Sequence, residues 1–597
     1  MKKILCLALA LAMLLGALAA LTSCGVPDDP GAKISVYLGD AVYDLDPTDY
    51  YVSDNAAQLM SLLYEPLFAL DEDGDLVCAA AEDYDVDEDE RKITIELKDS
   101  YWSDGARVKA DDFVYAWRNA ILDPTAANPA ATLFYDIENA AEIKKGEKSI
   151  YELGVVANLY ELIITYREGA DYEQLLKNLA SVATSPVRED VLNLAPAHWS
   201  KSSNSIVTNG PFKVKILDYD LGELTIERNV GYHQLVTTED YDNEVTPYQF
   251  YTTFMFDDDE QVFSYKDIEN KVIFYLSEAT LEDRKANKNN AMTADLASTY
   301  AYVFDTTNPL FAKKEVRQAL SLAVDRAAII NEITFGKAAT GFLSSVSSSN
   351  IYDKKNVQAL IEADAQMSKA KDLIKEVDFK GVKKSFTLTI NDDAESVKIA
   401  ELVKASWEEL GFTVSLKKVD STRSTIMDKA TDSHVTIYDS TVQYYVNGAA
   451  DGAKPKFDVI AVDWQTYSTD AFVGLCAFTS NLNGNGAIFK DNKTTYNENI
   501  SGWTNADYDK LISDAYGAAD ENVRAEKLRQ AEKLLVSEAP IIPIMFNVNY
   551  AFVSEELSNV EVDGFGNFIL TEAELDNYHD YLPEEEDNNN EEPETEE

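Results

Sequence analysis

The stretch that decides the fold runs from Arg91 to Ile121 and reads RKITIELKDSYWSDGARVKADDFVYAWRNAI. Its first part alternates apolar and polar residues, with Ile93, Ile95 and Leu97 on the apolar side. A period of two residues is typical of a strand that buries one face and exposes the other. The stretch therefore predicts a half-buried strand at its start.

A tight turn and an amphipathic helix are predicted to follow this strand. The Asp104 and Gly105 pair favours a turn. Helical spacing then places five apolar side chains on one face, namely Phe113, Val114, Trp117, Ala120 and Ile121. Asp111 and Asp112 lie where the helix dipole favours negative charge. Lys109, by contrast, cannot accept a bond from a free backbone amide as a capping residue would.

The N-terminus has the features of a secretory signal. Lys2 and Lys3 precede an apolar run over residues 4–21, as in signal peptides. This run is barely long enough to cross a bilayer, so an uncleaved anchor is the weaker alternative. The following LTSC resembles the lipobox of bacterial lipoproteins, and this resemblance implies cleavage before Cys24 and lipid transfer onto its sulfur. Two or more acyl chains would hold the protein stably at a membrane surface.

Length, charge and cysteine content limit the classes of protein that remain. Without the signal, about 570 residues are left, which is enough for two or three lobes. The formal net charge of −53 excludes a nucleic-acid-binding role, since phosphate binding needs clustered Lys and Arg; it is compatible with electrostatic steering of cationic ligands. Only Cys78 and Cys476 remain to form a disulfide, and their spacing does not decide whether they pair.

The chain contains no convincing metal or catalytic motif. Asp71, Asp73, Asp75 and Glu82 have the spacing of a calcium loop, but Leu76 stands where such a loop needs Gly. The four His residues lack the spacing of a zinc site. Ser368 to Lys371 reads SxxK without the companion motifs of serine acylating enzymes. We therefore predict neither a metal, nor a cofactor, nor an enzymatic activity.

Several motifs along the chain resemble one family, the bacterial extracellular solute-binding proteins of the oligopeptide and dipeptide type, family 5 of those that serve ABC importers. The resemblance is carried by WSDG at residues 102–105, NGPF at 209–212, VRQALSLAVDR at 316–326 and IIP at 541–543. It implies a hairpin after NGPF, one long helix around VRQALSLAVDR, and closing helices before the IIP strand. A structural role is favoured for Arg317 and Arg326 over ligand contact. The family usually has Thr at the position of Lys109 and Tyr at that of Phe212. The resemblance covers nearly all of the chain after the signal.

The resemblance implies an α/β, two-lobed periplasmic-binding-protein-like fold of type II, with an extra domain inserted in the first lobe. We expect a signal peptide over residues 1–23, a lipid-anchored tether over 24–32, the first part of the first lobe over 33–72, the inserted domain over 73–206, the second part of the first lobe over 207–304, the second lobe over 305–542, a return to the first lobe over 543–582 and a disordered acidic tail over 583–597.

The resemblance also directs attention to KFDVIAVDWQTYSTDAF, residues 456–472, as the loop that faces the ligand. In the peptide-binding branch, an Asp three residues after the Trp pairs with the ligand's α-amino group, but Trp464 is followed at that distance by Tyr467. Asp463 or Asp470 could supply the carboxylate instead, because a buried ammonium group requires compensation. Ordinary surface carboxylates are an equally good interpretation.

Two other segments are candidates for the cleft. By analogy with the loop that follows LDP in the family, Tyr50 to Asp54 are expected to line it. Residues 431–455 look like an insertion relative to the family, and their tyrosines could stack on a ligand, although packing on the surface of their own lobe is the more favoured interpretation.

The function implied by the resemblance is capture of peptides by a lipid-anchored, extracytoplasmic and monomeric protein. Closure about hinges near Thr306 and Ile542 would trap the ligand, and an ABC permease with its ATPase subunits would receive it. The missing Asp at Tyr467 leaves a non-peptide ligand open, such as an oligosaccharide, a nickel chelate or haem. A surface receptor or adhesin without a transport role is the alternative outside transport.

Overall fold

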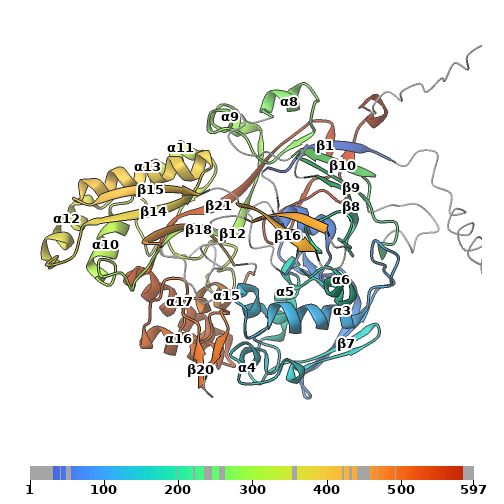
Figure 1. Cartoon of the computed structure of the whole chain (residues 1–597), viewed down its shortest axis with the longest axis horizontal. Helices are drawn as coiled ribbons and strands as arrows, with labels where there is room; N and C mark the ends of the chain where they lie inside the picture. The colour runs from blue at the N-terminus through green and yellow to red at the C-terminus, as the bar shows by residue number, and fades with distance from the viewer. Residues whose placement is uncertain are drawn as a thin grey trace, which may run out of the picture.

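The computed structural model describes residues 31–39, 42, 44–48, 56–196, 198–218, 222–233, 245–253, 263–352, 359–419, 422–428, 433–439, 457–466, 468–490 and 493–581. Two lobes and an inserted domain are seen in Figure 1. The lobes share one long sheet with the strand order β15-β14-β18-β12-β21-β11-β1-β10-β9-β8, and β13 (Lys337–Ala338) pairs with β21.

The opening stretch forms one inner strand of the inserted domain's sheet and the first helix of that domain. Strand β5 (Lys92–Leu97) lies between β4 (Ala81–Asp87) and β7 (Glu161–Thr165), and β6 (Val155–Asn158) completes an antiparallel sheet. Ile93 and Ile95 are fully buried, which confirms the alternation expected of this strand. Further helices of this domain are α4 (Ala140–Lys144), α5 (Tyr172–Asn178) and α6 (Glu189–Leu194).

The predicted helix is present, but its second half has a different hydrogen-bond pattern. The α-helix α3 (Ala110–Tyr115) continues as a π-helix, η2 (Ala116–Ile121). The Lys109 side chain forms no cap, but Asp112 Oδ2 accepts bonds from the Lys109 backbone N–H and from Trp102 Nε1. Phe113 and Trp117 are buried as expected.

The first lobe consists of a sheet, short hairpins and short helices, among them α8 (Tyr265–Glu269) and α9 (Leu281–Asn287). Its strands are β1 (Lys33–Tyr37), β8 (Phe212–Asp218), β9 (Glu223–Arg228), β10 (Gln249–Thr253) and β11 (Tyr275–Leu276). Helix α2 (Ala56–Leu63) leads into the hairpin of β2 (Phe68–Leu70) and β3 (Leu76–Cys78). The pairing of β8 with β9 is the hairpin expected after NGPF.

Two long antiparallel strands, β12 (Ala291–Phe304) and β21 (Ile541–Val553), run through both lobes. β21 pairs with β11 of the first lobe, and β12 pairs along Ser298 to Phe304 with β18 (Val459–Gln465) of the second. The register of β12 against β21 changes between Asp295 and Thr299. A bulge of this kind interrupts the ladder and bends the strand. Figure 1 shows both strands at the centre of the molecule.

The second lobe covers its sheet with helices on both faces. One face carries α10 (Lys314–Leu322), α11 (Arg326–Ile333), α12 (Met367–Glu376) and α13 (Ala394–Glu409) over β14 (Ser385–Asn391) and β15 (Thr413–Val419). The other carries α15 (Ala471–Cys476), α16 (Ala506–Tyr516) and α17 (Glu521–Glu538). The last two helices and β21 confirm the closing elements expected from the resemblance.

The single long helix expected around VRQALSLAVDR is wrong, because the chain breaks between α10 and α11. Asp325 caps the second helix by accepting the Ala328 N–H. Arg317 donates to the carbonyls of Phe311, Glu538 and Ala539, and Arg326 donates to that of Pro543. Both guanidinium groups are buried and have the structural role that was favoured for them.

The remaining sequence features have plain structural explanations. The segment with the spacing of a calcium loop forms a turn held by its own first residue, since Asp71 Oδ1 accepts hydrogen bonds from the backbone N–H groups of Asp73 and Asp75. Cys78 and Cys476 are free thiols and form no disulfide. The expected insertion overlaps a hairpin of β16 (Thr422–Asp428) and β17 (Ser433–Asp439).

Candidate functional site

Strand β18 brings two of the predicted site residues, Asp463 and Trp464, to the junction of the lobes. Val459 and Ala461 bury one face of the strand, and Ile460 and Val462 bury the other. Trp464 is half-buried, and its ring packs on Phe342 and Phe478 with centroid distances of 6.0 and 4.9 Å. The strand is thus held rigidly up to its carboxyl end.

Asp463 belongs to a polar cluster contributed by three neighbouring strands. Asn547 Nδ2 on β21 donates to Asp463 Oδ1 at 2.6 Å and to Ser298 Oγ on β12 at 2.9 Å. Asn547 Oδ1 has no hydrogen-bond partner within the part of the chain that the structure describes. We call Ser298, Asp463 and Asn547 the strand-junction cluster. It places a partly exposed carboxylate and a buried amide oxygen next to the bulge of β12.

Asp470 lies in a different environment, inside the second lobe. Its carboxylate accepts two bonds from Arg524, at 3.1 and 2.6 Å, and one from Asn350 Nδ2 at 2.8 Å. It also caps α15 through the Phe472 N–H. Burial lowers the pKa of Arg524, but the facing carboxylates of Asp470 and Asp136 outweigh burial and raise it above its ordinary value. The charge of Asp470 is therefore already compensated.

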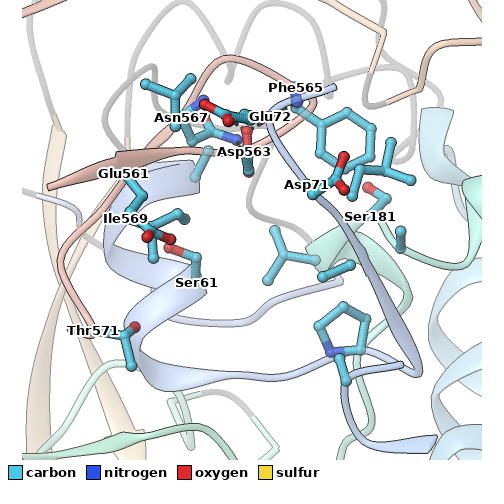
Figure 2. Close-up of a pocket in the computed structure, with 18 of the residues that line it drawn as sticks. Ser61, Asp71, Glu72, Ser181, Glu561, Asp563, Phe565, Asn567, Ile569 and Thr571 are labelled. Atoms are coloured by element: carbon cyan, nitrogen blue, oxygen red, sulfur yellow. Dashed lines mark hydrogen bonds between the residues drawn. The ribbon is translucent and has the colours of Figure 1, made fainter. Parts of the chain in front are cut away.

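A cavity of about 730 Å³ opens beside this cluster. Figure 2 shows it between α2, the loop at Asp71 and Glu72, and the C-terminal segment around Asp563 and Thr571. Ser298 and Gln465 reach it from β12 and β18. Most of its wall is apolar, and its charged lining residues are all acidic: Glu65, Asp71, Glu72, Asp73, Glu561 and Asp563. Such a lining favours a ligand with a positive charge and an apolar part.

Two of these carboxylates are tied into local networks. Glu65 Oε1 accepts the Tyr232 hydroxyl, and His233 Nε2 lies 2.9 Å from both Glu65 oxygens. Burial raises the pKa of Asp563 to about 6, although Asn567 and nearby backbone N–H groups donate to it. Glu65 is buried, so it contributes to the wall of the cavity rather than to its rim.

The other predicted site residues cannot be placed. Tyr50, Asp54 and Tyr467 lie outside the described residues, as does Cys24. Across the described ranges, no three His, Cys, Asp or Glu side chains are grouped so that they could hold a metal ion. A search of the same ranges for a helix long and apolar enough to span a membrane found none.

Sequence reasoning missed Ser298, Gln465 and Asn547. One signal for Asn547 was available: IIPIMFNVNY is apolar except for Asn547 and Asn549, which share a face of the strand. Nothing in the sequence around Ser298 or Gln465 distinguishes them from ordinary polar strand residues.

The comparisons with known proteins agree on one family. The sequence model described as "Bacterial extracellular solute-binding proteins, family 5 Middle" matches residues 75–486. The dipeptide-binding protein DppE of Bacillus subtilis is 26% identical over 522 residues, which is 84% of each chain. Oligopeptide-binding protein OppA of Listeria monocytogenes, solved with bound peptide, has a TM-score of 0.73 at 21% identity and covers 92% of this chain and 100% of its own.

A third comparison bears on the arrangement of the lobes. The unliganded, open form of the murein tripeptide-binding protein MppA has a TM-score of only 0.55, at 22% identity, although it covers 92% of this chain and 98% of its own. The lobes described above are therefore arranged more like those of the peptide-bound structure than like those of the open one.

Proposed function

Because the chain belongs to family 5 of the bacterial extracellular solute-binding proteins, we propose that it captures peptides between its two lobes and delivers them to an ABC importer. The observation that carries the proposal is the strand-junction cluster, which lies where strands from both lobes meet and adjoins a cavity with acidic lining. The names of the relatives support a peptide as the ligand.

Asp463 is the proposed partner of the peptide's α-amino group. Its carboxylate is only partly buried, whereas that of Asp470 is fully buried and accepts bonds from Arg524 and Asn350. An ammonium group entering a cleft needs such a charge to offset its lost hydration. Trp464, Tyr467, Tyr50 and Asp54 are proposed as further parts of the cleft wall.

Closure is proposed to occur by bending of β12 and β21. The expected hinges near Thr306 and Ile542 lie at the second-lobe end of these strands, whereas the ladder is interrupted between Asp295 and Thr299. We place the bend at this interruption, since fewer cross-strand bonds resist it there. We also propose the domain boundaries that the resemblance implies for residues 1–597.

The protein is proposed to bind and release its ligand unchanged, without a cofactor, as a monomer. An ABC permease and its ATPase subunits would supply the energy for transport. The ligand favours closure only to the extent that it binds the closed form more tightly than the open form.

A lipid on Cys24 is proposed to anchor the protein outside the cytoplasm. Cys24→Ser is expected to abolish incorporation of labelled palmitate and to move the protein from the membrane fraction to the soluble fraction of the producing bacterium, because no acyl chain would remain. Palmitate labelling of a Cys24→Ser variant equal to that of the unaltered protein would contradict the anchor.

A thermal-shift screen with separate pools of peptides, oligosaccharides and metal chelates tests the ligand class. A ligand at about 100 times its Kd stabilises the native state by about 2.7 kcal/mol, so the peptide pool is expected to raise the unfolding midpoint. A shift with oligosaccharides and none with peptides would indicate that the ligand is a sugar and not a peptide. No shift with any pool would favour the receptor or adhesin alternative.

A further inference from the structure

The inserted domain and the second lobe touch at several places, including a bond from the Tyr496 hydroxyl to Glu147, and we call two patches of this contact the seam. The first patch joins the loop of residues 124–128 to that of residues 484–487, and the second surrounds Tyr516 of α16. In the chain, the inserted domain is connected on both sides to the first lobe, and the second lobe is reached only through β12 and β21. The seam is therefore a noncovalent contact between two bodies that these strands allow to separate.

Backbone groups make the first patch. The Asn128 N–H donates to the Gly484 carbonyl at 3.1 Å, and the Ala487 N–H donates to the Pro124 carbonyl at 2.8 Å. Asn128 Nδ2 also donates to the Thr48 carbonyl of the first lobe at 3.0 Å. Such bonds require the two chains to approach as closely as neighbouring strands do.

Glycine makes that approach possible. Gly484 and Gly486 have φ values of +77° and +69°, and a Cβ atom would lie 2.8 Å from the Asn128 carbonyl oxygen and 2.3 Å from that of Pro124. Both distances are shorter than van der Waals contact, and each atom met is backbone. A side chain at either position would have to push the two bodies apart or distort one of them.

Side chains make the second patch. The Tyr516 hydroxyl donates to the Tyr135 carbonyl at 2.8 Å, and the Arg167 guanidinium stacks 3.9 Å from the centre of the Tyr516 ring. Arg167 also pairs with the buried carboxylate of Asp136. Close by, Ser468 Oγ donates to Asn178 Oδ1 at 2.6 Å. One continuous set of buried apolar side chains extends across these contacts, from Phe134 and Tyr135 to Phe472 and Tyr508.

The seam also engages the segment expected to face the ligand. Ser468 and Thr469 both contact the inserted domain, the latter through a bond from Gln174 Nε2 at 3.4 Å. The same segment continues into Asp470, whose partner Arg524 lies near Asp136 of the inserted domain. Two buried ion pairs, one from each body, are thus brought together where the lobes meet. Opening would expose both of them, together with the apolar side chains between them.

We propose that the seam is a latch that holds the lobes closed in the absence of ligand, and that Gly484 and Gly486 are its positioning residues. The contacts of the seam then favour the closed form even without ligand. Ligand binding therefore has to supply less of the free energy of closure. The latch also delays release, since every dissociation must first break the seam.

The test compares glycine variants in the purified chain without added ligand. Gly484→Ala and Gly486→Ala place a methyl group in the seam. Gly381→Ala is the matched control, because Gly381 also has φ +77° but a Cβ there would meet no atom within 4 Å. Small-angle X-ray scattering reports the radius of gyration, and hydrogen exchange reports the amides of Asn128 and Ala487. Amides of β5 serve as the reference for an intact inserted domain.

The two seam variants are expected to have a larger radius of gyration than the unaltered protein and about tenfold faster exchange at both seam amides. Gly381→Ala is expected to match the unaltered protein in both measurements. Tyr516→Phe, which keeps the ring over Arg167 but loses the bond to Tyr135, is expected to accelerate exchange at the same amides without adding bulk. Scattering and exchange that are equal in all four variants and the unaltered protein would overturn the latch. Because no ligand is present, this result is independent of whether the ligand is a peptide.

Discussion

Asp463 and Asp470 lie in one segment, but their carboxylates differ in burial and in hydrogen-bond partners. Asp463 Oδ1 accepts from Asn547 on a neighbouring strand and remains partly exposed. Asp470 is fully buried against Arg524. We propose that the first meets the ligand, whereas the second is held inside the second lobe by its ion pair.

Asp463→Asn is therefore expected to weaken peptide binding by about tenfold or more, which is about 1.4 kcal/mol, while leaving the unfolding midpoint nearly unchanged.

Asp470→Asn is expected to lower the free energy of unfolding by about 3–5 kcal/mol, because it leaves the buried Arg524 charge without its partner. Titration calorimetry and urea unfolding measure the two effects.

N-acetylated peptide provides the control for Asp463. Removing the ligand's positive charge should weaken its binding to the unaltered protein, and the further loss caused by Asp463→Asn should then disappear. An equal loss for free and acetylated peptides would show that Asp463 does not contact the α-amino group.

The sequence could not separate these two aspartates. Arg524 and Asn350, which bind Asp470, lie 54 and 120 residues away in the chain, and Asn547 lies 84 residues from Asp463. Residue roles of this kind depend on tertiary pairing, which no local pattern contains. Trp464, by contrast, could be placed from its strand alone.

At the scale of elements, NGPF forms a close junction between the β8 strand and the end of α2. The Gly210 N–H donates to the Leu63 carbonyl at 2.9 Å, and Asn209 bonds both backbone groups of Glu65. A Cβ at Gly210 would lie 2.6 Å from the Leu63 carbonyl carbon. The motif is therefore explained by packing.

Gly210→Ala is expected to destabilise the protein by about 1–3 kcal/mol, the usual cost of overpacking. Gly517→Ala is the control, because the nearest atom to its Cβ is the Ser513 carbonyl oxygen at an ordinary 3.6 Å. Chemical denaturation measures both variants, and equal stability of the two would refute this account of the junction.

Elements with a clear local signal could be predicted, and two features without one could not. β5 and the β8–β9 hairpin follow from their alternating apolar residues, and the last two helices follow from the family resemblance. The break between α10 and α11 could not be foreseen, because Val316, Leu320 and Ile329 all pack into the same core, so the apolar period continues across it. The π-helical turn after Tyr115 likewise keeps Trp117 and Ile121 buried.

At the scale of the molecule, the two-lobed fold followed from motifs spread along the chain, but the contact between the inserted domain and the second lobe did not. Residues 124–128 and 484–487 meet across more than 300 positions, and turn-forming glycines are common in loops. The net charge of −53 argued against a nucleic-acid-binding role, but it did not indicate that acidic groups would line a cavity.

Titration calorimetry of the purified chain with di-, tri- and pentapeptides tests the central claim most directly. Capture between the lobes predicts saturable binding of one peptide per chain, with a negative heat-capacity change from buried apolar surface. Saturable binding of an oligosaccharide or chelate, with no heat from any peptide, would contradict the claim.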